Sequence, residues 1–295
     1  MSRKFLAGAG ALALVLFAIR QYGSNLPFMA HPAYAEVGAR DEFSQRACLA
    51  YGPTHGDRHT TVFVDPGHGG PDPGAIALAP GGSTVDEKTI TLAVALDLLP
   101  ILRDHGYHVV MSRIDDSSVA RVTPGAVQSG AYTLAGEHAD IAARAHCANE
   151  GGAQLLLSIH FNSFDDPGAG GPETLYDPAR PFSTQNLRFA GIVQRSIVQG
   201  LSGAGLQVTD RGVLSDTDQG AAALSARAAS YGHLLELGPA APGWFSHPSN
   251  MPGALCEPLF LTNPDEQHLA MSASGQKAMA TAFAHAIDAY FGKPK

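Results

Sequence analysis

Short apolar runs alternate with segments of helical periodicity along residues 60–292, and this alternation narrows the possible folds more than any other feature of the chain. The runs expected to be strands are 60–64, 107–111, 154–159, 172–176, 232–237 and 254–256, and the segments expected to be helices are 87–104, 139–149, 186–201 and 275–290. Alternating strands and helices are typical of an α/β fold with a mostly parallel sheet and helices on both faces. Because no internal repeat, change of composition or linker interrupts the pattern, we expect a single domain over residues 60–292.

The composition is that of a folded, acidic protein. Of the 295 residues, 45% are hydrophobic, and 19 Lys and Arg stand against 27 Asp and Glu, which gives a formal net charge of −8. This hydrophobic content is too high for a disordered chain, and the length suffices for a full core. Since a protein that binds nucleic acid usually carries a basic face, we expect no nucleic-acid partner.

The first 35 residues have the features of an export signal. Arg3 and Lys4 supply positive charge, residues 5–19 carry none, and Ala33-Tyr34-Ala35 forms an A-x-A cleavage site. The uncharged stretch is shorter than the roughly 20 residues of a membrane span, which favours a signal peptide over an uncleaved N-terminal anchor. We therefore expect export, to the periplasm, the cell envelope or the medium, with residues 36–59 as a leader segment before the domain.

Export makes a disulfide bond permissible. The three cysteines, Cys48, Cys147 and Cys256, allow at most one internal bridge and leave one thiol over. The sequence leaves the pairing open.

Residues able to bind a metal or to move protons follow several of the expected strands. His68 follows the first run, His160 follows the run 154–159, Glu257 follows the last run, and Glu87 begins the first expected helix. Ligands of α/β sheets gather at the carboxyl ends of the strands. Two histidines and one carboxylate can bind a zinc ion and leave its fourth coordination position open for water. A second carboxylate nearby can accept a proton from that water.

Each of these residues alone also has a simpler interpretation. His160 fits a hydrogen-bonded core residue, and Glu87 fits a first-turn acid favoured by the helix dipole. Asp86 adjoins Glu87 and is an alternative ligand. The glycine-rich turn around His68 lacks the Lys-Ser/Thr ending of a P-loop and the G-x-G-x-x-G spacing, which excludes both nucleotide interpretations.

Taken in order, the motifs resemble a known enzyme family. They are Val64-Asp65-Pro66-Gly67-His68-Gly69-Gly70, Asp72-Pro73-Gly74-Ala75, Glu87-Lys88, Arg144 with Ala148-Asn149, Ser158-Ile159-His160-Phe161-Asn162-Ser163 and Asp210-Arg211-Gly212-Val213. This series resembles the zinc-dependent N-acetylmuramoyl-L-alanine amidases of bacterial cell walls, the type-3 amidase family. The resemblance runs from about residue 60 to residue 290.

The resemblance implies a site and a reaction. It implies that His68, Glu87 and His160 bind Zn²⁺, that the fold is a twisted mixed α/β sheet, and that peptidoglycan or muropeptides are the substrate. The reaction is hydrolysis of the amide between N-acetylmuramic acid and L-alanine. The resemblance identifies neither the substrate-binding residues nor the oligomeric state. Two alternatives stay open, namely another exported zinc amidohydrolase or peptidase, and a non-catalytic wall-binding homologue.

Two glutamates match parts of the pattern around the family's catalytic glutamate. The tetrapeptide Leu235-Glu236-Leu237-Gly238 matches the residues at the centre of this pattern. Residues 251–264 match the residues on both sides of the centre without a gap and place Glu257 at the position of the catalytic glutamate. In this second match Pro258-Leu259 replaces the usual Leu-Gly that follows the glutamate. The longer match favours Glu257 as the general base. Glu236 is then the alternative base, on the neighbouring strand, and residues 238–250 form an extra loop.

Two further polar residues of the motifs have a structural interpretation. Arg144 and Asn149 are expected to hold their helix against the sheet, and the resemblance also permits a role near the cleft.

Overall fold

The computed structural model describes residues 34–38, 41–79, 81–218 and 225–292. Residues 1–33, which hold most of the predicted export signal, lie outside this part of the chain. Among the described residues, no helix is both long enough and apolar enough to span a membrane.

The described part of the chain contains an eight-stranded sheet in the order β1-β2-β6-β3-β9-β12-β10-β11. Four neighbouring pairs are parallel and three are antiparallel. In sheet order the strands are β1 (Ala35–Glu36), β2 (Ala47–Tyr51), β6 (His108–Arg113), β3 (Thr61–Pro66), β9 (Leu155–Ile159), β12 (Gly253–Glu257), β10 (Glu173–Tyr176) and β11 (Gly212–Ser215). The four central strands are all parallel, as expected from the sequence, and the antiparallel pairs lie toward the edges.

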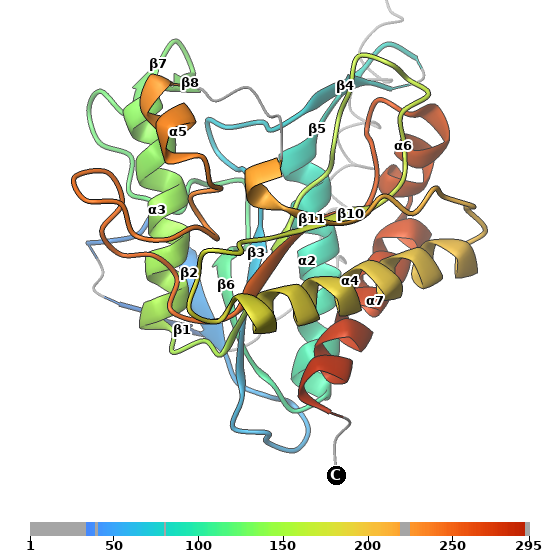
Figure 1. The fold of residues 1–295 in the computed structure, drawn as a ribbon, viewed down its shortest axis with the longest axis horizontal. Helices are drawn as coiled ribbons and strands as arrows, with labels where there is room; N and C mark the ends of the chain where they lie inside the picture. The colour runs from blue at the N-terminus through green and yellow to red at the C-terminus, as the bar shows by residue number, and fades with distance from the viewer. Residues whose placement is uncertain (1–33, 39–40, 80, 219–224, 293–295) are drawn as a thin grey trace, which may run out of the picture. The chain divides into compact units, whose positions relative to one another are not determined.

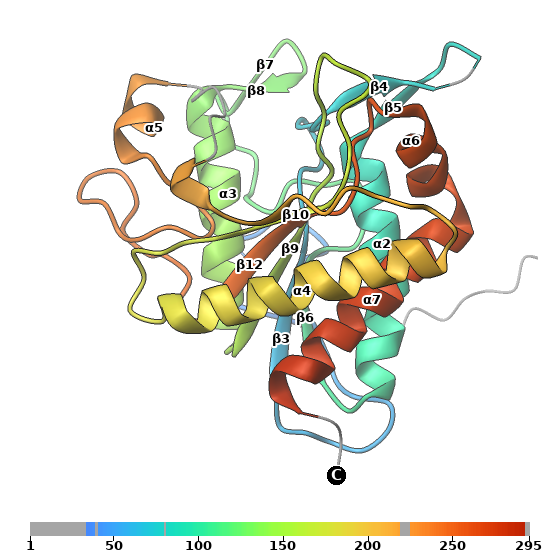
Figure 2. The same cartoon turned by 45° about the vertical axis from the view of Figure 1, so that its right-hand side comes forward.

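Helices cover both faces of this sheet (Figures 1 and 2). Helices α2 (Glu87–Asp104), α4 (Ser183–Gly203) and α7 (Ala273–Phe291) lie on one face, and α3 (Leu134–Glu150) lies on the other. Val62 and Val64 of β3 pack toward the three helices, whereas Phe63 packs toward α3. Successive side chains of a strand point to opposite faces, so each strand fills both cores. This arrangement confirms the predicted fold class.

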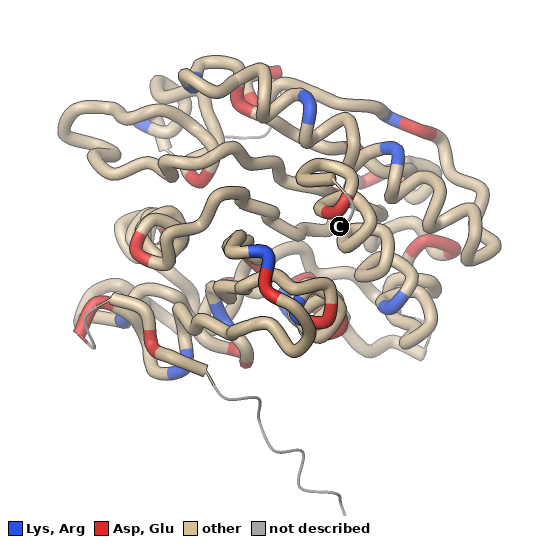
Figure 3. Tube along the Cα trace, turned by 90° about the horizontal axis from the view of Figure 1, so that it is seen from below, with Lys and Arg blue, Asp and Glu red and all other residues tan. Residues whose placement is uncertain are grey.

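Shorter elements complete the fold. They are the hairpins β4 (Ile76–Leu78) with β5 (Thr84–Asp86) and β7 (Val127–Gln128) with β8 (Ala131–Tyr132), the 3₁₀ turn η1 (Asp216–Asp218), α5 (Ala226–Tyr231) and α6 (Pro264–Met271). Acidic and basic residues are interspersed along the described trace (Figure 3).

Residues 36–59 are not a separate leader, which corrects the sequence-based expectation. Strand β2 pairs with β6 in antiparallel register, Leu49 opposite Met111, and most of its side chains are buried. Cys48 also forms a disulfide with Cys147 of α3. A paired strand on this side covers an edge of β6 that would otherwise expose unpaired backbone groups. The domain therefore begins before residue 60.

Residues 232–237, predicted to be a strand, form turns instead. Gly232 ends α5 with a φ of 69°, and the Leu237 amide donates to the Leu234 carbonyl. The place beside β12 that this segment was expected to fill belongs to β10, which pairs antiparallel with β12. Glu236 is consequently a buried loop residue and does not lie on a neighbouring strand.

We expect replacement of both Cys48 and Cys147 by Ala to lower the free energy of unfolding by about 2–5 kcal/mol, because the bridge constrains the unfolded chain. It links residues that are 99 positions apart and joins β2 to α3. Urea denaturation under oxidising conditions measures the loss. Reductant should destabilise the wild-type protein by a similar amount and leave the double variant unchanged. Equal midpoints for the oxidised wild type and the variant would contradict this role of the bridge.

Candidate active site

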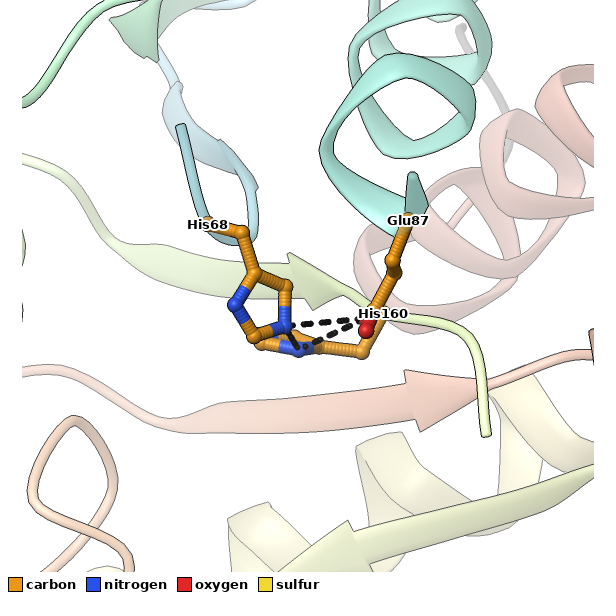
Figure 4. Close-up of side chains that lie close together, drawn as sticks. All are labelled: His68, Glu87 and His160. Atoms are coloured by element: carbon orange, nitrogen blue, oxygen red, sulfur yellow. Dashed lines mark hydrogen bonds and ion pairs between the residues drawn. The ribbon is translucent and has the colours of Figure 1, made fainter. Parts of the chain in front are cut away.

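Three side chains predicted from the sequence converge at one edge of the sheet (Figure 4). His68 follows β3, His160 follows β9, and Glu87 is the first residue of α2. His68 Nε2 lies 3.0 Å from Glu87 Oε1 and 3.0 Å from His160 Nδ1, and His160 Nδ1 lies 3.2 Å from Glu87 Oε1. Strands β3 and β9 are parallel neighbours, so their carboxyl ends bring the two histidines together.

The spacing of these three atoms suits a zinc ion. Zinc bonds of 2.0–2.1 Å in tetrahedral geometry place neighbouring ligand atoms about 3.3 Å apart. Burial opposes a charge on His68, but the carboxylates of Glu87 and Asp72 outweigh it and raise the pKa of His68 to about 10. The cluster therefore stabilises positive charge. Asp86, the alternative ligand, is not one of the converging residues.

Hydrogen bonds orient the three side chains. Asp72 Oδ2 lies 2.7 Å from His68 Nδ1 and leaves Nε2 directed at the cluster. Glu87 Oε1 accepts from the Phe161 amide and Oε2 accepts from the Ala75 amide, both at 2.8 Å. Partners of this kind fix the orientation of metal-binding side chains. The motif Asp72-Pro73-Gly74-Ala75 belongs to the family resemblance, but the sequence analysis assigns Asp72 no role of its own, although its place four residues after His68 in a glycine-rich turn is a usable signal.

Two glycines allow this close approach. A Cβ added to Gly67 would lie 2.3 Å from Nε2 of His160, and a Cβ added to Gly74 would lie 2.6 Å from Oε2 of Glu87. Gly74 also has a φ of 66°, in the left-handed region that favours glycine. Neither position has space for a side chain while the cluster keeps its geometry.

We expect Gly67→Ala to weaken zinc binding about 10- to 100-fold, the loss that misoriented ligands typically cause. The new methyl group would displace the His160 ring. Competition with a chromogenic chelator measures the affinity. Gly203→Ala is the matched control, because an added Cβ there meets no atom within 4 Å and the backbone is not left-handed. Equal zinc affinity in the two variants would show that the space beside Gly67 does not position His160.

Arg144 supports the loop that carries His68. Its guanidinium donates to Asp65 Oδ1 at 2.6 Å, to the His68 carbonyl at 2.6 Å and to Asp140 Oδ2 at 3.0 Å. These bonds join α3 to the end of β3, in agreement with the predicted role of Arg144. Asn149 differs, because its side chain bonds to the backbone of residues 248–250 and not to the sheet.

Glu257 lies beside the cluster at the end of β12. The preceding residue, Cys256, pairs with Ile159, directly before His160. Glu257 Oε2 is buried and has no hydrogen-bond partner among the described residues. Burial and then the negative charge of Glu87 raise the pKa of Glu257 well above its usual value, while His68 opposes this shift. A bound cation, like the positive charge of His68, would favour the ionised carboxylate of Glu257 over its protonated form. The unpaired oxygen therefore fits a metal site next to it.

Glu236 occupies a different environment. Its Oε2 lies 2.9 Å from Ser158 Oγ, and that hydroxyl lies 3.0 Å from Asp65 Oδ2. Burial and then the charge of Asp65 raise the pKa of Glu236 well above its usual value. One carboxylate oxygen of Glu236 also lies within 4.8 Å of a ring nitrogen of His160. Both candidate bases are therefore near His160, but Glu236 is already engaged with Ser158.

A small cavity adjoins the two histidines. Its volume is about 110 Å³, and its walls include His68, His160, Tyr132, Leu234 and Glu236. Leu234 and Glu236 come from the turns that follow α5, so this segment forms part of the wall. The sequence analysis placed Glu236 near the site as the alternative base, but it does not predict the contact of Leu234, which depends on how this segment folds back over the sheet.

Comparison with known proteins places the chain in a family. The sequence profile of the N-acetylmuramoyl-L-alanine amidases matches residues 62–289. N-acetylmuramoyl-L-alanine amidase AmiA of Salmonella typhimurium is 28% identical over 246 residues, which cover 78% of this chain and 75% of AmiA. The matched region is most of the chain and contains the converging residues.

Solved structures agree in fold. An N-acetylmuramoyl-L-alanine amidase from Clostridium difficile 630 has a TM-score of 0.53 and 26% identity, with coverage of 79% of this chain and 96% of that one. The CwlD amidase from Clostridioides difficile, solved in complex with the GerS lipoprotein, has a TM-score of 0.59 and 24% identity, with coverage of 79% and 98%. With the profile matching more than half of its residues, this chain belongs to the N-acetylmuramoyl-L-alanine amidase family.

Proposed function

We propose that this enzyme cuts the amide between N-acetylmuramic acid and L-alanine of peptidoglycan with Zn²⁺ held by His68, Glu87 and His160, and with Glu257 as the general base. Family membership supports the reaction and the substrate. The observation that carries the zinc assignment is the convergence of three donor atoms at 3.0–3.2 Å from one another.

The reaction has two chemical obstacles, because an amide is a poor electrophile and water is a poor nucleophile. Zinc, when bound, polarises a carbonyl and lowers the pKa of water from about 15.7 toward about 7. Glu257 takes a proton from the attacking water with its unpaired Oε2 and then passes it to the amide nitrogen. The new C–O bond forms at the lactyl carbonyl, the C–N bond breaks, and the stem peptide leaves with a free L-alanine amine.

Residues of the surrounding shell keep this machinery in place. Asp72 fixes the His68 ring through Nδ1, and the amides of Ala75 and Phe161 fix the two oxygens of Glu87. Since hydrogen bonds already position these side chains, little reorganisation is needed before the reaction.

Product analysis tests the proposed reaction. The zinc-loaded protein is incubated with purified peptidoglycan, and the released material is identified by mass spectrometry. An amidase releases intact stem peptides with a free L-alanine amine. Cleavage inside the stem peptide would instead identify a peptidase, and the absence of new amines would identify a wall-binding protein. Pre-treatment with a chelator is the control, because it should abolish a zinc-dependent reaction.

We further propose that the protein acts outside the cytoplasm and begins near Glu36 in its mature form. The charged start, the uncharged stretch and the Ala33-Tyr34-Ala35 sequence support this, as does the disulfide, a bond typical of oxidising compartments. N-terminal sequencing of the protein from the native cell envelope tests it. A membrane-bound protein that starts at Met1 would favour an uncleaved anchor, and a cytosolic protein would exclude both.

A further inference from the structure

A second group of potential metal ligands lies at other strands of the sheet. Asp177 directly follows β10 and Asp216 directly follows β11, and these two strands are parallel, with Tyr176 opposite Ser215. Their carboxyl ends therefore deliver two carboxylates side by side. His233 joins them from the segment that follows α5.

The three side chains are close together and shielded from water. His233 Nδ1 lies 2.7 Å from Asp177 Oδ2 and 3.5 Å from Asp216 Oδ2. The two aspartate side chains are 0% exposed and that of His233 is 18% exposed. One ligand atom from each residue lies within 4.8 Å of the others. This spacing is compatible with a single ion between them.

The buried polar atoms of the cluster are not all satisfied by the residues around them. Asp177 Oδ1 accepts from the Ala179 amide and Asp216 Oδ2 accepts from the Leu234 amide. Asp177 Oδ2 and His233 Nδ1 are buried and pair with each other at 2.7 Å, whereas the second oxygen of Asp216, Oδ1, is buried and has no hydrogen-bond partner among the described residues. Buried polar atoms normally find partners, so the unpartnered oxygen of Asp216, next to a second buried carboxylate and an imidazole, points to a missing ligand.

The charges of the cluster are not balanced by the groups around it. The imidazole of His233 lies 2.7 Å from one carboxylate and 3.5 Å from the other, and both carboxylate side chains are 0% exposed. Arg180 is attracted to Asp177, but its guanidinium donates to the carbonyls of Leu237, Gly238 and Ser249. A buried pair of carboxylates with one imidazole needs a proton or a cation to be stable.

We propose that Asp177, Asp216 and His233 form a second metal site that binds Zn²⁺. Calcium and magnesium prefer all-oxygen ligand sets, whereas zinc is bound by mixtures of imidazole and carboxylate. Among the divalent ions of the first transition row, zinc also binds such sets more tightly than manganese or iron.

This site has a structural consequence for the cavity beside His68. His233 immediately precedes Leu234, and Leu234 and Glu236 form part of that cavity's wall. An ion shared by β10, β11 and His233 ties this segment to the sheet. The second site therefore positions the cavity wall without taking part in the reaction.

Zinc content tests the proposal. The full-length protein, dialysed against Zn²⁺ and then against metal-free buffer, should hold about two zinc ions per chain. Asp216→Asn, which keeps the size of the side chain, and His233→Ala should each hold about one. His160→Ala should also hold about one, and His160→Ala/His233→Ala almost none. Circular dichroism confirms that each variant is folded.

A second measurement separates this site from the proposed active site. In the His160→Ala background, Zn²⁺ should raise the melting temperature and protect residues 225–238 from proteolysis, and His233→Ala should abolish both effects. One zinc per wild-type chain, lost on His160→Ala and kept on His233→Ala and Asp216→Asn, would overturn the second site. That result would leave the proposed amidase centre intact. If zinc were instead lost only with His233→Ala, the zinc assignment of the amidase centre would be overturned.

Discussion

Glu257→Gln is expected to lower amide hydrolysis about 10²–10⁴-fold, the usual contribution of a general base. Glutamine has nearly the same size and still forms hydrogen bonds, but it accepts no proton from water. Zinc content and fold should be unchanged, because Glu257 is not one of the three converging ligands. Release of soluble muropeptides from purified peptidoglycan measures the rate.

Glu236→Gln is the matched control for this prediction. Burial and then the charge of Asp65 raise the pKa of Glu236, and a glutamine of the same size fits the same buried position. The bond to Ser158 can also be kept. We expect a mild effect on the rate. A dead Glu236→Gln enzyme with an active Glu257→Gln enzyme would instead make Glu236 the base, provided that both variants retain zinc.

The parts of the fold that the sequence predicted well are governed by local periodicity. The first helix was expected over 87–104, and α2 spans Glu87–Asp104. The strand expected over 154–159 is β9 (Leu155–Ile159), a run of five buried residues. The rule that ligands gather at strand ends makes His68 and His160 candidates, and the family resemblance implies the full set with Glu87 from the start of α2; the three side chains do converge.

The parts that the sequence did not predict depend on contacts between distant residues. Strand β2 is short, and only its pairing with β6 and the bond from Cys48 to Cys147 make it part of the sheet. No local pattern encodes a partner 99 residues away. Periodicity alone therefore predicts that the domain starts at residue 60 and that residues 36–59 form a leader, although β2 belongs to the sheet.

The segment 232–237 shows a second reason why secondary structure could not be predicted from the sequence. Its apolar residues are typical of a buried strand, but Gly232 ends α5 in the left-handed conformation and directs the chain into turns. Leu237 and Glu236 are buried all the same. Burial could be predicted from composition, whereas the choice between strand and turn was decided by the helix end and by the competing strand β10.

Replacing His68 or His160 by Ala is expected to remove zinc from the active site and abolish hydrolysis. Each variant lacks one of only three protein ligands, and even the loss of a supporting hydrogen bond typically weakens metal binding about 10- to 100-fold. The measurement is elemental analysis in the Asp216→Asn background, so that an ion at the second site does not mask the loss. Activity is measured in the same preparations.

His55→Ala is the control, because the side chain of His55 is 78% exposed and lies outside the three groups of potential ligands. It should keep both zinc and activity. The comparison is informative because His68 and His160 also have a structural interpretation, as two half-buried rings in edge contact at a centroid distance of 4.6 Å. Under that interpretation their replacement costs stability but leaves the zinc content unchanged. Unchanged zinc in both variants would therefore show that these histidines serve the fold, whereas loss of zinc in folded variants identifies them as ligands.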